Sequence, residues 1–212
     1  MIEIYNELYS LYGQQHWWPA EKQFEMILGA ILTQNTAWHN VSIAIENLKS
    51  HGLLDLFPLL QADENLVKTL IKPVGFFNVK YERLMYMLEY LMEQGLDNLK
   101  FSDAPVDELR KDFLDIKGVG RETADSILLY AFGRPIFVVD AYTRRLFSRL
   151  GYAWMEKADY DEIQRHFMDS LPLDSAIYNE YHALIVRHCK DFCRKNPLCF
   201  ECALTCPMKQ QA

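Results

Sequence analysis

The sequence is poor in the features that mark membrane and secreted proteins. No apolar run approaches the ~20 residues that a membrane-spanning helix needs, and the opening stretch, "MIEIYNELYS", has no basic segment followed by an apolar core. Positive charge is also scarce, and the net charge is −7, whereas phosphate binding needs lysine and arginine. We therefore expect a soluble cytoplasmic protein without a membrane partner, on which any nucleic-acid contact comes from a local basic face.

Cysteine is absent from the first 188 residues, and all five cysteines lie between Cys189 and Cys206. Disulfides would be expected to link distant parts of a small secreted chain. Cysteines packed into one segment of a cytosolic protein indicate a metal site instead. Thiolates at this spacing suit either zinc or a [4Fe–4S] cluster, and the residues alone leave both open.

Strand signals are also scarce, and the apolar residues recur at helical spacing almost throughout. In "FEMILGAILTQ" they fall at positions 24, 27, 28, 31 and 32, which is typical of a helix buried along one face. The apolar run "IFVV" has no visible partner strand, so we expect a buried extended link there. The sequence thus predicts an all-α fold of about ten short helices.

These helices are expected to form two helical lobes with a cleft between them. The first lobe is a six-helix block at 22–132 that contains a helix–hairpin–helix. The second combines 1–21 with 133–188, because the later helices need the N-terminal segment to complete a bundle. A Cys-rich loop and tail at 189–212 follow.

A tight glycine turn, Gly118-Val119-Gly120, joins two of the short helices. Glycine permits a turn that would strain other residues, and it lets a ligand approach the backbone. The second helix then presents its N-terminal N–H groups and the positive end of its dipole, which suits a phosphate. Taken alone, the turn is also compatible with an ordinary helix connection.

The surrounding stretch, "LDIKGVGRETADSILLYAFGRPIFVVDAYTRRLFSRLG", resembles the endonuclease III superfamily, the DNA glycosylases with a helix–hairpin–helix, a Gly/Pro-rich loop and an aspartate. The segments "GAILTQNTAWHNV" and "KPVGFFNVKYERL" and the cysteine tail resemble further parts of that family, so the resemblance covers almost the whole chain. It implies a base excision repair enzyme that acts on double-stranded DNA containing a damaged base, as a nucleoid-associated monomer.

The aspartate of this resemblance is Asp140, which follows the apolar run and begins a helix. Aspartate is a favoured N-cap residue, and a carboxylate in that position stays ionised at neutral pH. Cleavage of an N-glycosidic bond builds positive charge on the sugar, which an ionised carboxylate stabilises. By resemblance, Asp140 is the catalytic residue.

The family's bifunctional members carry a nucleophilic lysine after the hairpin, where this chain has Glu122. A carboxylate cannot form the imine that strand cleavage requires. Lys117 lies on the other side of the glycines and is not a convincing substitute. We therefore expect a monofunctional glycosylase without lyase activity. A purely structural alternative is that Glu122 is a first-turn glutamate favoured by the helix dipole.

The tryptophans point to a substrate class. A carboxylate near the flipped base would favour a cationic base, and alkylated purines are cationic and are attracted to aromatic faces. The segment "HWWPAEKQFEMILGAILTQNTAW" resembles the 3-methyladenine DNA glycosylase branch, with Trp17, Trp18 and Trp38 as candidate pocket residues; each could instead pack in a core. The alternatives are a glycosylase for mismatched or oxidised bases and a catalytically inactive protein that binds DNA damage.

The resemblance also assigns DNA contacts. A glycosylase extrudes its target nucleotide and fills the gap, and by resemblance Gln34 enters the duplex. The remaining candidates are the hairpin residues and two basic residues of the tail: Gly118, Val119, Gly120, Arg121, Arg194 and Lys195.

For the cysteines, the resemblance favours a [4Fe–4S] cluster held by Cys193, Cys199, Cys202 and Cys206. Their gaps of five, two and three residues depart from the family's six, two and five. This departure leaves open which cysteine is the fourth ligand, with Cys189 as the alternative, and it keeps zinc as the alternative metal.

Overall fold

The computed structural model describes residues 1–18, 20, 22–96 and 100–207, and within these residues it is helical and has no strand. The predicted all-α class is confirmed. Two compact units form: Trp18–Arg134 is one, and Met1–Trp17 with Pro135–Ala212 is the other. The sequence predicts these boundaries at 22 and 132 and treats the tail, 189–212, as a separate part. Residues 208–212 of that tail lie outside the described residues.

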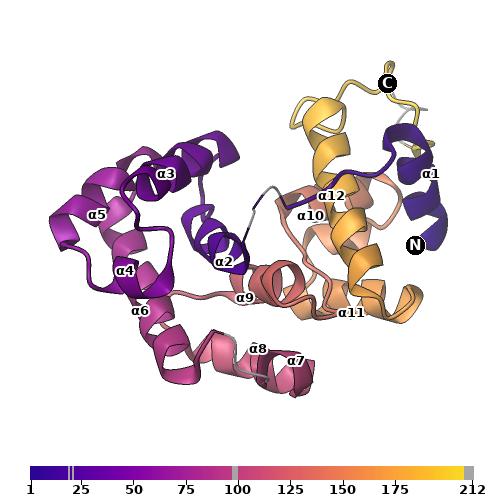
Figure 1. Cartoon of the computed structure of the whole chain (residues 1–212). Coiled ribbons are helices and arrows are strands. Elements are labelled where there is room, and N and C mark those ends of the chain that lie inside the picture. The colour runs from indigo at the N-terminus through magenta and orange to yellow at the C-terminus, as the bar shows by residue number, and fades with distance from the viewer. Residues whose placement is uncertain (19, 21, 97–99, 208–212) are drawn as a thin grey trace. The chain divides into compact units, whose positions relative to one another are not determined.

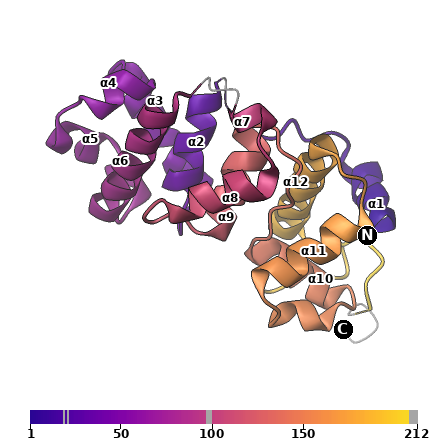
Figure 2. The ribbon, with the colours of Figure 1, turned by 90° about the horizontal axis from the view of Figure 1, so that it is seen from below.

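The unit Trp18–Arg134 contains the middle helices, drawn from indigo to pink in Figure 1. Figure 2 shows the same helices from below, with α2 beside α6. The elements are α2 (Gln23–Leu32), α3 (Trp38–Ser50), α4 (Leu56–Leu60), α5 (Glu64–Leu70), the 3-10 turn η1 (Lys72–Val74), α6 (Phe77–Gln94), α7 (Lys100–Asp103), α8 (Val106–Asp115), α9 (Arg121–Ser126) and the π-helical turn η2 (Ile127–Ala131).

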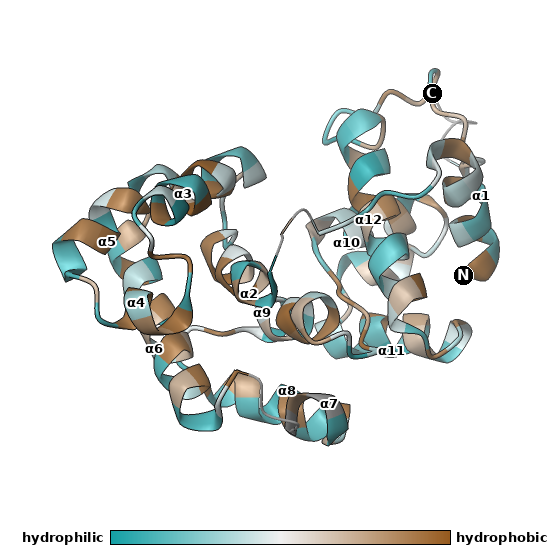
Figure 3. Cartoon of the chain, in the orientation of Figure 1, coloured by the Kyte–Doolittle hydropathy of each residue, from teal (hydrophilic) through white to brown (hydrophobic). Residues whose placement is uncertain are grey.

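Helix α2 is the central element of this unit, because it packs against α3, α6, α9 and η2. Its residues from Ile27 to Leu32 are all buried. Helices α3 and α6 carry both hydrophobic and hydrophilic residues (Figure 3), and their buried residues include Val41, Leu48, Leu84 and Leu91. Polar residues set where some of them begin: the Asp63 side chain accepts a hydrogen bond from the N–H of Leu66 and caps α5, as its position in the sequence predicts.

A buried lysine joins two loops of the same unit. Lys80 on α6 is only 2% exposed, and its Nζ donates hydrogen bonds to the carbonyls of Leu32 and Val74, both at 2.9 Å. Burial, aided by the charge of Arg83, lowers the pKa of Lys80 to about 8. Leu32 ends α2 and Val74 ends η1, so one amine fixes the starts of the loops that follow both elements.

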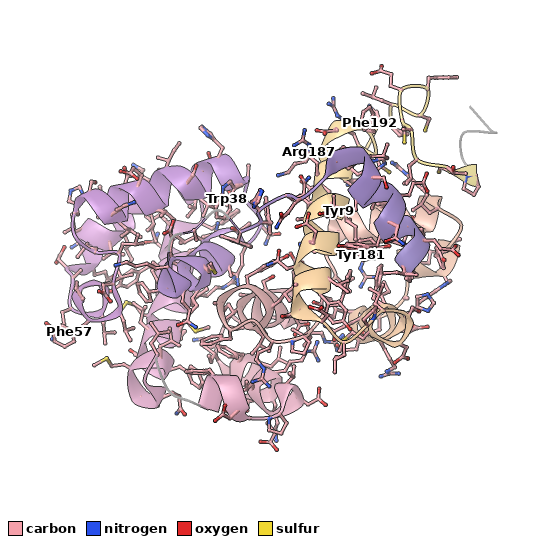
Figure 4. All side chains as sticks on the ribbon, turned by 45° about the vertical axis from the view of Figure 1, so that its right-hand side comes forward. Tyr9, Trp38, Phe57, Tyr181, Arg187 and Phe192 are labelled. Atoms are coloured by element: carbon pink, nitrogen blue, oxygen red, sulfur yellow. The ribbon has the colours of Figure 1, made fainter. Side chains whose placement is uncertain are left out.

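The unit formed by Met1–Trp17 and Pro135–Ala212 pairs the first helix with the last. Its elements are α1 (Ile2–Tyr12), α10 (Ala141–Arg149), the 3-10 turn η3 (Ala153–Glu156), α11 (Tyr160–Ser170) and α12 (Ser175–Asp191). Figure 4 labels Tyr9 on α1 and Tyr181 on α12, and the two helices pack against each other. Rings of Phe137, Phe147, Phe167 and Tyr181 fill the core at centroid distances of 4.1 to 6.1 Å.

The "IFVV" segment, Ile136–Val139, is buried and extended and pairs with no described strand, as the sequence predicts. Side chains of α11 satisfy part of its backbone. Gln164 donates to the carbonyl of Phe137 at 2.6 Å, and the N–H of Val139 donates to the hydroxyl of Tyr160 at 3.2 Å. This link delivers the chain to the start of α10.

Among the described residues, no helix combines the length and the apolar character needed to cross a bilayer.

The role of Lys80 generates a stability prediction. In Lys80→Met, two buried carbonyls lose their donor, and each unsatisfied group costs about 1–3 kcal/mol. We expect the free energy of unfolding, measured by urea denaturation, to fall by about 2–5 kcal/mol.

The matched control is Lys68→Met, which removes an exposed i,i+4 pair with Glu64. Such pairs contribute under about 1 kcal/mol, so a similar loss in both variants would contradict the structural role of Lys80.

Candidate active site and cysteine pocket

Asp140 stands at the point where the buried link turns into α10. It is the N-cap residue of that helix, and one carboxylate oxygen, Oδ1, accepts hydrogen bonds from Thr143: from its N–H at 2.7 Å and from its Oγ1 at 2.9 Å. The cap predicted from the sequence is therefore present. The cap fixes Oδ1 of the carboxylate and does not involve Oδ2.

The second oxygen, Oδ2, faces His182 of α12, whose Nε2 lies 3.5 Å away. The two side chains are 11% and 8% exposed. Burial raises the pKa of Asp140, but the charge and hydrogen bond of His182 and the two hydrogen bonds of Thr143 together hold that pKa below its ordinary value. Asp140 is therefore a buried carboxylate that is ionised at neutral pH.

Sequence reasoning missed His182. It lies in a different helix, and no local spacing or cap signal connects it to Asp140. Only the packing of α10 against α12 brings the two side chains together.

The helix–hairpin–helix is formed by α8 and α9. Gly118 has a φ of +87°, and a Cβ there would overlap the Cγ of Arg83. Gly120 is the N-cap of α9 with a φ of −94°, and no described atom lies within 4 Å of where its Cβ would be. A bidentate ion pair between Arg110 and buried Asp125 joins the two helices. The first glycine is thus required by geometry, and the second leaves the backbone open.

Gln34 lies beside this hairpin. Its Nε2 donates to the carbonyl of Gly118 at 3.1 Å and to Oγ1 of Thr123 at 3.0 Å, while its Oε1 accepts from Arg83. The amide therefore ties the loop after α2 to the hairpin. Its entry into a duplex stays a prediction, and in the protein alone both ends of the amide are engaged.

Two neighbouring residues that the sequence did not single out are more exposed than Gln34. Asn35, with a φ of 54°, and Phe76, with a φ of 45°, both adopt the left-handed conformation that non-glycine residues rarely take. Phe76 is 76% exposed. They stand on the two loops whose starts Lys80 fixes. Asparagine is enriched in this conformation, so Asn35 carried a weak sequence signal, as did the aromatic residue after Gly75.

Two of the three predicted pocket tryptophans, Trp18 and Trp38, lie together in the unit Trp18–Arg134. Trp18 meets Trp38 edge to face at 4.9 Å and Tyr130 at 5.1 Å. Trp17 belongs to the other unit, where its ring lies 5.8 Å from Nζ of Lys190. Figure 4 labels Trp38 at the start of α3. Trp18, Trp38 and Tyr130 therefore form an aromatic cluster, in which the sequence did not identify Tyr130, and the pocket role of the three tryptophans stays a prediction.

Glu122 is exposed on the first turn of α9, next to exposed Arg121. Lys117, on the other side of the glycines, donates from Nζ to the hydroxyl of Tyr86 at 3.1 Å and lies over that ring at 5.1 Å. Lys117 is therefore engaged with an aromatic residue of α6.

Four of the five cysteines line one pocket: Cys193, Cys199, Cys202 and Cys206. The fifth, Cys189, is not part of its wall, and its Sγ instead donates to the carbonyl of Tyr142 at 3.5 Å. None of these cysteines forms a disulfide in the described part of the chain. The pocket thus contains the four cysteines that the resemblance selected and leaves out the alternative.

The wall of this pocket is mostly apolar, with one basic side chain. Its other lining residues include Leu146, Arg149, Leu150, His188, Phe192, Pro197 and Leu204. Arg149 donates to Sγ of Cys193 at 3.3 Å, and a hydrogen bond with Cys189 together with Arg149 and Arg145 lowers the pKa of Cys193. Among the described residues, no three His, Cys, Asp or Glu side chains converge closely enough to hold a single metal ion.

The basic tail residues Arg194 and Lys195 are exposed, and their backbone is held by Arg149, which donates to both carbonyls at 2.7 and 3.2 Å. Both residues therefore lie on a loop whose backbone is held in place, and Nε of Arg194 also donates to the carbonyl of Lys190 at 2.8 Å.

Comparison with known proteins agrees with this arrangement. The family model of the HhH-GPD superfamily base excision DNA repair proteins matches residues 28–173. A Methanocaldococcus jannaschii protein, provisionally named a DNA repair glycosylase, is 52% identical over 96% of this chain and 93% of its own length.

Two solved structures are also similar. The H. pylori 3-methyladenine DNA glycosylase MagIII, bound to 1,N6-ethenoadenine, is 29% identical, with a TM-score of 0.76 over 89% of this chain and 96% of that one. An endonuclease III–DNA complex, 19% identical, shares the fold with a TM-score of 0.81 over 99% of this chain and 95% of that one. The chain belongs to the HhH-GPD superfamily of base excision DNA repair proteins, and within it to the DNA glycosylases.

Proposed function

We propose that the protein is a monofunctional DNA glycosylase that removes an alkylated purine flipped out of duplex DNA. The observation that carries this proposal is the buried, ionised carboxylate of Asp140, combined with the absence of an amine at position 122. This reaction needs a carboxylate and a water molecule.

In this reaction the bond between C1′ of the sugar and the purine nitrogen breaks, and its electron pair leaves with the base. The sugar becomes positively charged, and the carboxylate of Asp140 stabilises that charge. A water oxygen then bonds to C1′ and releases its proton to the carboxylate or to solvent. A cationic alkylated purine leaves as a neutral base, so no acid is needed to protonate it.

The lyase step needs an amine that can reach the sugar. Glu122 cannot form an imine, and Lys117 is bound to Tyr86. Lys80 has a lowered pKa but is buried, with both of its hydrogen bonds made to carbonyls. These three positions support hydrolysis without strand cleavage.

Two observations support an alkylated purine as the substrate. The H. pylori relative, which is 29% identical, is a 3-methyladenine DNA glycosylase bound to 1,N6-ethenoadenine. The cluster of Trp18, Trp38 and Tyr130 offers aromatic faces of the kind that attract cationic rings. Neutral oxidised bases would gain less from such a surface.

On this proposal, backbone N–H groups and exposed loop residues contribute more to DNA binding than the net charge of the protein does. The amides after Gly118 bind a phosphate, and the exposed Asn35 and Phe76 contact the duplex near the flipped nucleotide. Arg194 and Lys195 contact the DNA backbone from their fixed loop. This explains how a chain of net charge −7 engages DNA.

We infer that the cysteine pocket holds a [4Fe–4S] cluster, as the family's cysteine pattern suggests, with zinc as the alternative metal. Four thiols line one mostly apolar pocket, which suits a cluster held by cysteine alone. Cys193, Cys199, Cys202 and Cys206 would hold it, and the cluster would serve as a structural staple for the loop that carries Arg194 and Lys195.

The first prediction from the proposed function concerns base release. On duplexes carrying 3-methyladenine-type, oxidised, uracil or abasic lesions, we expect the protein to release the alkylated purine and to leave strands that break only after hot alkali. Asp140→Asn should lower the single-turnover rate at least about 10³-fold while duplex binding stays within a few-fold, because the transition-state charge loses its partner.

Borohydride should trap no covalent complex with DNA, in contrast to a lyase-competent glycosylase run in parallel. A trapped complex would overturn the monofunctional assignment, and an active Asp140→Asn variant would overturn the catalytic one.

The second prediction separates the two glycines of the hairpin. Gly118→Ala should lower the free energy of unfolding by more than about 2 kcal/mol, because alanine is strained at positive φ and would overlap Arg83. Gly120→Ala should change it by less than about 1 kcal/mol and yet weaken duplex binding, because its methyl group stands where a phosphate approaches. Unchanged duplex binding in Gly120→Ala, measured by fluorescence anisotropy, would contradict the phosphate site.

The third prediction concerns the metal. Protein purified without oxygen should contain about four iron atoms per chain and show broad visible absorbance. Cys202→Ser should lose iron and absorbance, whereas Cys189→Ser should keep both, because Cys189 lies outside the pocket. Zinc in place of iron, or loss of metal in Cys189→Ser, would contradict the assigned cluster or ligand set.

A further inference from the structure

The two oxygens of the Asp140 carboxylate have different surroundings. Oδ1 accepts both hydrogen bonds of the helix cap, from the N–H and the Oγ1 of Thr143. Oδ2 takes no part in the cap and faces Nε2 of His182 at 3.5 Å. Since the torsion that orients a carboxylate is broad and roughly two-fold, the cap alone leaves the plane of the group loosely defined.

His182 is well placed to define it. Its side chain is 8% exposed and comes from α12, a helix that packs along α10, so the imidazole is fixed by a different element from the one that carries the carboxylate. A separation of 3.5 Å is longer than a close charge-assisted hydrogen bond. Oδ2 therefore keeps a lone pair that can accept a hydrogen bond from a water molecule.

We propose that His182 is a positioning residue for the glycosylase reaction: it holds Oδ2 of Asp140 in the direction of the sugar carbon. The inference rests on the proposed function of Asp140 and adds a residue to it. His182 touches neither the base nor the sugar in this account, and it acts only through the aspartate.

The decisive comparison uses two variants of His182 and one control. His182→Phe fills the space without a donor, and His182→Gln keeps an N–H. Tyr178→Phe is the control, because Tyr178 is fully buried on the same helix and its hydroxyl has no hydrogen-bond partner among the described residues. Rates are measured under single turnover on the base that the wild-type protein releases most rapidly, and duplex affinity is measured separately.

A small misplacement of a catalytic group costs up to about 100-fold in rate. We expect His182→Phe to lower the single-turnover rate about 10- to 100-fold with duplex affinity unchanged, and His182→Gln to recover at least half of that loss on a logarithmic scale. Tyr178→Phe should match the wild type. Equal rates in the wild type and His182→Phe would overturn the proposal, as would equal losses of rate in the phenylalanine and glutamine variants.

A second measurement does not depend on catalysis. The Cγ signal of Asp140, identified by its absence in Asp140→Asn, is followed by carbon NMR as pH falls. Other titratable groups whose charge reaches Asp140 are Tyr142 on its own helix and Cys189 on α12, and the hydroxyl of Tyr160 lies at the preceding N–H. All three are the same in every variant compared.

His182→Phe should raise the carboxyl pKa above that of the wild type, and Tyr178→Phe should leave it unchanged. Identical titrations in the wild type and His182→Phe would overturn the proposal. If the wild-type protein releases no base at all, the proposed function fails, and this titration still decides whether His182 controls the carboxylate. If His182→Phe does not fold, His182→Gln carries both comparisons.

Discussion

The need to keep one carboxylate charged inside the protein is the constraint on which the rest of its unit depends. A buried carboxylate is unstable unless hydrogen bonds and opposite charge compensate for the water it has lost. Asp140 meets this need by capping α10 through Thr143 and by facing His182 on α12. The same contacts begin a helix, dock it on its neighbour and keep the carboxylate charged. On the proposed function, the helix cap and the catalytic role of Asp140 therefore depend on one set of interactions.

Helix α10 carries this arrangement to the cysteine pocket. Its first residue follows Asp140, and near its end Arg145 donates to the carbonyl of Cys193 at 2.7 Å while Arg149 donates to the Cys193 thiol. Helix α12 makes a similar connection through His188, which follows His182 on the same helix. Nδ1 of His188 lies 2.8 Å from the hydroxyl of Tyr12, and its Nε2 lies 3.6 Å from the thiol of Cys202. Two packed helices thus each contact the carboxylate and the cysteine loop. A loop that is anchored in this way also keeps the basic residues beside it in place, and a metal held by its cysteines, as proposed, would add to that anchoring.

The sequence could predict whatever depends on local chemistry. Helical spacing predicted the all-α class, the position of Asp63 and Asp140 after non-helical segments predicted their caps, and the family's cysteine pattern selected the four residues that line the pocket. What it could not predict depends on long-range packing. His182 faces Asp140 only because α10 and α12 pack together, and Arg83 closes over Gly118 only because α6 passes the hairpin. Likewise, the boundary between the two units falls between adjacent Trp17 and Trp18, and no local pattern in the sequence marks that position.

On the proposed function, Glu122 removes strand cleavage from the enzyme and leaves hydrolysis intact. Hydrolysis and strand cleavage share the carboxylate, but only cleavage needs an amine that is both near the sugar and free to attack. Position 122 holds no amine, and two lysines of the same unit make other contacts: Lys80 fixes two loops and Lys117 donates a hydrogen bond to Tyr86. Glutamate in the first turn of α9 suits the helix dipole better than lysine would. On the proposed function, hydrolysis of the glycosidic bond is therefore left to Asp140.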